Sequence, residues 1–209
     1  MPRGAYALAD PVHGTPLALE RFTCTTGPAG WRYTSEVFDP AGEVLLGGVD
    51  LACDSRWRQT RVDVRSGSWR LRGGTSGPDV LFTRHPADAS PGSRDVEVDQ
   101  VERARLLTGR SPAFAVTAAR LLALEPGARS RVTALAVTEP VLATRVVAQT
   151  WALVDVTDHE TGGGEALRVE RYDVVDLDTG DHRTVHLTGD VLLDAPGAEL
   201  VDLDGRPGA

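Results

Sequence analysis

Tryptophan and arginine gather in the first third of the chain, and together they offer the clearest chemistry in the sequence. Trp31, Trp57 and Trp69 are three of the four tryptophans, and residues 56–72 hold six arginines but a single acid, Asp63. A guanidinium beside an indole ring at a cavity mouth can bind a carboxylate, a phosphate or a sugar. The alternative is a solvated strand face on which arginine stems cover the indole rings.

Alternation along residues 56–65 predicts a strand with two different faces. Val62 and Val64 would face the core, which places Arg58 and Thr60 at the open end of the same face. We therefore expect the ligand-binding side chains to include aromatic, arginine and amide groups. The candidates are Trp31, Tyr33, Trp57, Arg58, Arg61, Trp69, Phe114, Gln149, Trp151 and Tyr172.

Motifs for most catalytic chemistry are absent. The chain has no lysine, which excludes Schiff-base enzymes and P-loop proteins, and it has no HExxH, GxSxG, GxGxxG or CxxC motif. His182 and His186 are four residues apart, but on a strand that spacing is about 13 Å, too far for one metal ion. We expect no metal and no cofactor.

Charge and cysteine usage restrict the partners. The net charge is −8, and residues 111–209 carry all of the excess, with 8 arginines against 16 acids. This balance argues against a general nucleic-acid binder and against adsorption to anionic membranes. Cys24 and Cys53 form no disulfide framework. With no signal-peptide pattern and no apolar run long enough for membrane insertion, we expect a cytoplasmic protein.

Most of the chain alternates as β-strands do, and one segment has helical character. Ser111 can cap a helix whose first residue is Pro112, and this central helix is predicted over 111–124. Glycine, proline and serine predict a long loop at 73–94, and residues 1–18 are expected to form an N-terminal arm. Strands are predicted at 19–25, 31–38, 43–53, 56–65, 68–72, 95–107, 130–139, 143–156, 166–177, 183–188, 190–194 and 199–203.

These elements predict a single domain, residues 1–209, that is mainly β (α+β). One helix among about a dozen strands favours a half-open antiparallel barrel, or rolled sheet, wrapped around that helix.

Three blocks of sequence resemble a bacterial glycolipid-binding family that was formerly a domain of unknown function. They are Gly30-Trp31-Arg32, the Asp-x-x-Trp-Arg-x-x-Arg block from Asp54 to Arg61, and Gly109-Arg110-Ser111-Pro112-Ala113 with Arg120 and Leu122. The resemblance implies a spiral β-roll, similar in shape to carriers whose half-open barrels hold acyl chains, and it implies a homodimer. Phe114-Ala115 and Ala118 depart from the family's more polar helix, which implies a more apolar pocket.

Two functions from different classes follow. The first is binding of a hydrophobic or amphiphilic small molecule, glycolipid-like or polyketide-like, in the cavity of the roll. The second is a cofactor-independent isomerase or cyclase of a hydrophobic natural-product intermediate, in which a few donors polarise the substrate. Its candidate donors are Tyr33, Arg58, Arg61, Gln149 and Tyr172. A structural dimer without a ligand is the third reading.

Overall fold

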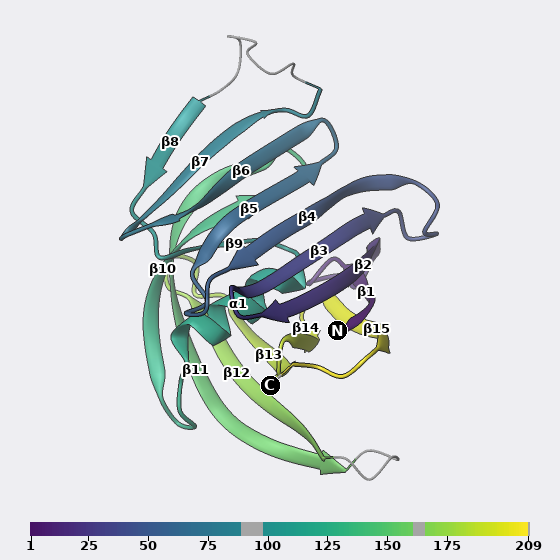
Figure 1. Ribbon diagram of the computed structural model, residues 1–209, viewed down its shortest axis with the longest axis vertical. Coiled ribbons are helices and arrows are strands. Elements are labelled where there is room, and N and C mark those ends of the chain that lie inside the picture. Colours follow the sequence, from purple (N-terminus) through teal and green to yellow (C-terminus); the bar gives the residue numbers. More distant parts are fainter. Residues whose placement is uncertain (89–97, 161–165, 209) are drawn as a thin grey trace.

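The computed structural model describes residues 1–88, 98–160 and 166–208, and the described part forms one open sheet curled around a helix (Figure 1). Neighbouring strands are antiparallel except β9 and β10, which are parallel. The sheet order is β8-β7-β6-β5-β4-β3-β2-β1-β15-β14-β13-β12-β11-β10-β9. The elements are β1 (Arg3–Ala9), β2 (Pro16–Gly27), β3 (Gly30–Phe38), β4 (Leu45–Cys53), β5 (Gln59–Ser66), β6 (Trp69–Ser76), β7 (Asp79–Pro86), β8 (Val98–Glu102), β9 (Leu106–Thr108), α1 (Pro112–Leu122), β10 (Arg129–Thr138), β11 (Ala143–Glu160), β12 (Ala166–Asp176), β13 (His182–Thr188), β14 (Val191–Ala195) and β15 (Ala198–Asp204).

The predicted fold class is confirmed, and the strand order explains how the sheet is built. The first and last strands, β1 and β15, pair with each other in the middle of the sheet, and β8 and β9 form its two edges. Each half of the sheet is therefore a run of strands that pair with their neighbours in sequence. The inward side chains of both halves and the helix form one hydrophobic core.

The predicted helix is confirmed with slightly different ends. It runs from Pro112 to Leu122 and ends at Ala123, which adopts the left-handed conformation. Residues 112–114 and 116–119 are buried, whereas Leu121 and Leu122 are half-buried. The N-terminal part of α1 is therefore more deeply buried than its C-terminal end. No helix of the described residues is long and apolar enough to cross a membrane.

The predicted loop at 73–94 is wrong for its described part, where β6 and β7 form a hairpin. The glycines that indicated a loop lie inside β6, where neighbouring strands leave no room for a side chain. A Cβ at Gly73 would lie 2.6 Å from the Leu81 carbonyl oxygen, and one at Gly74 would lie 2.6 Å from that of Thr60. Glycine here marks close backbone approach within a sheet. Residues 89–97 lie outside the described residues.

The N-terminal arm predicted at 1–18 is also wrong. Residues 3–9 form β1, which pairs with β2 on one side and β15 on the other, and Tyr6 and Leu8 are buried. Small residues obscure the alternation of β1 in the sequence. Gly4 is required because the backbone of β15 comes close to it. A Cβ at Gly4 would lie 2.0 Å from the Asp202 carbonyl oxygen.

Candidate functional site

Two cavities flank the start of α1, and both are lined by Arg110 and Ser111. The first cavity has a volume of about 330 Å³ and lies against β2, β4 and the β5–β6 turn. The second cavity has a volume of about 370 Å³ and lies between α1 and the strands β10 to β14. Both volumes are at the lower end of the range for small-molecule sites.

The first cavity combines apolar walls with a buried carboxyl group. Leu8, Ala18 and Val49 line it, and so does Glu20, which is fully buried. Oε1 of Glu20 accepts hydrogen bonds from Tyr33 at 2.9 Å, Ser35 at 2.7 Å and Ser111 at 2.6 Å. Oε2 of Glu20 is buried without a hydrogen-bond partner among the described residues.

Burial raises the pKa of Glu20, and the negative charge of Glu139 raises it further, against the opposing effect of the three hydroxyl donors. The net direction is upward, which favours the uncharged acid. At the rim, Glu139 pairs with Arg110 at 3.4 Å between Oε2 and Nη1. The pKa of Glu139 is also raised by burial, although Arg110 opposes the shift. Burial thus acts in the same direction on both carboxyl groups of the first cavity.

The second cavity combines an apolar wall with several guanidinium groups. Its apolar lining includes Trp151, Val185 and Leu192. Its charged lining residues are Arg110, Arg145, Asp176 and Arg183. The nearest charged atoms of Arg145 and Asp176 are 4.0 Å apart. Burial lowers the pKa of Arg183, and Asp176 and Asp181 oppose that shift.

The predicted aromatic and amide candidates fall into separate places inside the roll. Gln149 and Trp151 line the second cavity, where the Gln149 Oε1 accepts a hydrogen bond from the Trp151 Nε1 at 3.1 Å. Tyr33 lines neither cavity, but its hydroxyl donates a hydrogen bond to Glu20, which lines the first cavity. Three more candidates lie in the core and line neither cavity. Buried Trp31 donates its Nε1–H to Asp190 at 3.1 Å, the Phe114 ring lies next to Gly109, and Tyr172 packs edge-on against Trp151.

Arg58 lies elsewhere because of a bulge at the start of β5. Gln59 pairs with Cys53 and Arg61 pairs with Ala52, so Thr60 is an extra residue. The bulge turns Gln59 inward, where it bonds Thr117 on α1 at 2.8 Å, and leaves Arg58 and Thr60 exposed. The expected place of Arg58 and Thr60 at the mouth of the core face is therefore wrong.

Trp57 precedes β5 instead of belonging to it. It lies in the turn between Asp54 and Arg58, with a φ of 61°. Its ring is 5.3 Å from that of Trp31, so it covers the end of the core and lines neither cavity.

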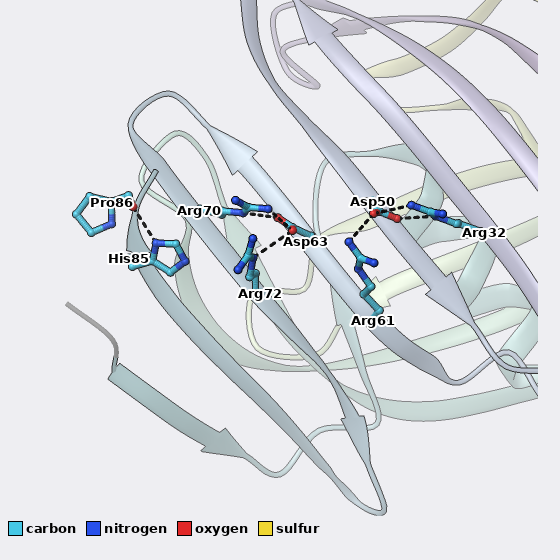
Figure 2. A network of polar contacts seen from close by, with 8 residues as sticks. All are labelled: Arg32, Asp50, Arg61, Asp63, Arg70, Arg72, His85 and Pro86. Atoms are coloured by element: carbon cyan, nitrogen blue, oxygen red, sulfur yellow. Dashed lines mark hydrogen bonds and ion pairs between the residues drawn. The ribbon is translucent and has the colours of Figure 1, made fainter. Parts of the chain in front are cut away.

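Arg61 of β5 and Arg70 and Arg72 of β6 form ion pairs with Asp50 and Asp63, as Figure 2 shows. Arg61 and Arg32 both bind Asp50 at 2.9 Å. Trp69 lies on a neighbouring strand, where the Arg84 guanidinium is 3.9 Å from its ring centre. This arrangement matches the solvated strand face in which arginine stems cover an indole ring.

Sequence reasoning missed Glu20 and Arg183, although their positions carried a signal. Glu20 is in phase with the buried Ala18 and Phe22 on β2, and Arg183 is in phase with the buried Val185 on β13. A charged residue at a core-facing position of an alternating strand is uncommon unless it is paired or functional.

Comparison with known proteins supports the fold. Neither a model of a known protein family nor a curated protein matches the chain. A solved DUF1089 family protein from Pseudomonas aeruginosa is similar, with 17% identity, a TM-score of 0.57, and coverage of 85% of this chain and 89% of that chain. A β-barrel-like protein of the domain of unknown function DUF1849 from Brucella abortus has 14% identity and a TM-score of 0.58, covering 97% and 96%.

Proposed function

We propose that this protein binds a hydrophobic or amphiphilic small molecule at the start of α1. The observation that carries the proposal is the pair of cavities, about 330 Å³ and 370 Å³, that share Arg110 and Ser111 as lining residues. Each has apolar walls and a small number of polar groups, the composition typical of small-molecule sites. Arg110 and Ser111 lie between the two cavities and can contact a ligand in either of them.

The isomerase or cyclase alternative has less support. Catalysis without a cofactor needs several donors around one substrate. Of the five donors considered, Gln149 lines one of the two cavities, and Tyr33, Arg58, Arg61 and Tyr172 line neither. Binding is therefore the function that the geometry supports best. A reducing compartment fits the two buried cysteines, Cys24 and Cys53, which are both free.

The first experiment asks whether the protein carries or takes up an amphiphile. Native mass spectrometry of detergent-free protein is expected to show a bound amphiphile, and the dye Nile red is expected to bind saturably. Ala115→Phe places a large side chain in the second cavity, because Ala115 is half-buried and lines it. This variant should weaken Nile red binding at least about tenfold.

Ala143→Phe is the matched control, because Ala143 is exposed at the start of β11 and lines neither cavity. It should leave the affinity for Nile red unchanged. A protein without a bound amphiphile and without saturable Nile red binding would contradict the proposal. Equal binding by wild type and Ala115→Phe would also contradict it.

A further inference from the structure

We infer that the second cavity is an anion site, in which Arg183, Arg110 and Arg145 bind the carboxylate or phosphate group of an amphiphile. The inference rests on the proposed function and specifies the chemical class of the ligand. Four observations support it: an unpaired guanidinium, a local excess of positive charge, the uncapped start of α1, and an adjoining apolar wall.

Arg183 is unusual among the arginines of the described chain. The other half-buried arginines, which are Arg70, Arg84, Arg120 and Arg171, each contact a carboxylate or a backbone carbonyl. Arg183 is equally half-buried but forms no hydrogen bond or ion pair with any described residue. The charges of Asp176 and Asp181 act on this guanidinium, but neither carboxylate lies within ion-pair distance of it, so its N–H donors remain available to an anionic ligand.

The charges that line the second cavity have a positive sum. Three arginines and one acid line it, which gives a net charge of 3 − 1 = +2 in a chain whose total is −8. The acid, Asp176, already accepts hydrogen bonds at Oδ1 from the backbone N–H groups of Asp178 and Thr179. Its Oδ2 lies 4.0 Å from the Arg145 Nη2, and Arg110 pairs with Glu139 at 3.4 Å, so Arg183 is the arginine of this lining that has no ion pair among the described residues.

The start of α1 adds to this positive potential. Ser111, Pro112 and Ala115 line the second cavity, and the first turn of the helix holds no acidic residue. The hydroxyl of Ser111 does not cap the helix, because it donates to Glu20. Among the described residues, no side chain therefore caps the helix N-terminus with a hydrogen bond.

The apolar wall shows where the rest of such a ligand would lie. Trp151, Val185 and Leu192 are each at most 1% exposed and line the same cavity as the arginines. An anionic head at Arg183 would therefore have its hydrocarbon portion against these side chains. The ligand class that satisfies both features is an anionic amphiphile, whose head is a carboxylate or a phosphate.

The test compares decanoate with decanol, which share a tail and differ in the charge of the head group. Isothermal titration of detergent-free protein at low ionic strength should show decanoate binding about tenfold more tightly, with a preference that falls as salt is added. Arg183→Gln should remove most of this preference and leave decanol affinity within about twofold. The control Arg131→Gln makes the same charge change on the exposed face of β10 and should change neither affinity.

The outcomes separate this inference from the proposed function. Saturable but equal binding of decanoate and decanol by wild type would overturn the anion site and keep the proposed function. The same holds if Arg183→Gln weakens both ligands equally. If neither ligand binds, both proposals fail.

A second comparison uses decyl phosphate and inorganic phosphate. Equal affinity for these two ligands would keep the anion site and overturn an amphiphile as its ligand. The wild-type comparison needs no variant, so it decides the question even if Arg183→Gln fails to fold.

Discussion

The Ser111 hydroxyl donates a hydrogen bond of 2.6 Å to Oε1 of Glu20, which joins the start of α1 to the middle of β2. Tyr33 and Ser35 on β3 donate to the same oxygen. The helix is therefore held against the first half of the sheet by a polar cluster inside the core. Because Arg110 and Ser111 line both cavities, this cluster also fixes the position of the candidate ligand site.

Glu20 should make folding stability depend on pH. Its pKa is raised in the folded state by burial and by Glu139, but it is ordinary in the unfolded chain. The folded protein therefore holds this proton more strongly, and the contribution of Glu20 is fully present below the ordinary glutamate pKa. It is lost as the pH rises through the folded-state pKa. Gln is isosteric with the protonated acid and does not titrate in this range.

We therefore expect Glu20→Gln to gain stability relative to wild type as the pH rises from about 5 to about 8. Urea unfolding of both proteins at several pH values measures this difference. A difference that stays constant across the range would mean that Glu20 titrates normally in the folded protein. Glu43→Gln, on an exposed residue, is the control and should track wild type.

Much of the fold could be predicted from the sequence because inward and outward residues alternate along most strands. The strands β2 and β3 follow this pattern and lie where alternation places them. β1 and the second half of β6 (residues 73–76) were missed because glycine fills positions where neighbouring backbones come close. The requirement for glycine comes from strands distant in sequence, so composition indicates a loop instead.

The candidate site was harder to predict than the fold, and the reason is register. A single extra residue, Thr60, reverses the faces of the preceding segment, so Arg58 moves to the solvent and Gln59 to the core. The meeting of Glu20 with Ser111 joins residues 91 positions apart, which no local pattern reveals. Gln149 and Trp151 were found because they occupy inward positions of a regular strand.

Gly30 and Gly27 face each other at the β2–β3 turn but should respond very differently to alanine. Gly30 has a φ of +127°, and a Cβ there would lie 2.0 Å from the Cys53 carbonyl oxygen, whereas a Cβ at Gly27 meets nothing within 4 Å. Gly30→Ala should therefore lower the free energy of unfolding by about 2 kcal/mol or more. Gly27→Ala should change it by less than about 0.5 kcal/mol. Chemical denaturation of the two variants measures both values, and equal losses would refute the close approach of β4.

Asp63 and Arg70 should be coupled more strongly than the neighbouring pair Asp50 and Arg61, although both lie in the network of Figure 2. The side chains of Asp63 and Arg70 are 8% and 24% exposed, and those of Asp50 and Arg61 are 22% and 59% exposed. Less water screens the first pair, and Arg70 holds Asp63 with two hydrogen bonds, from Nε at 2.8 Å and Nη2 at 2.6 Å.

Double-mutant cycles with Asp63→Asn and Arg70→Gln should give a coupling energy of about 1–3 kcal/mol. The same cycle for Asp50→Asn and Arg61→Gln should give less than about 1 kcal/mol, because exposed ion pairs contribute little. Arg70 and the nearby Arg72 outweigh the upward effect of burial, so the pKa of Asp63 is lowered in the folded state. The coupling of Asp63 with Arg70 should therefore persist at neutral pH and decline as acid protonates Asp63. Equal coupling in the two cycles would show that burial does not set the strength of these ion pairs.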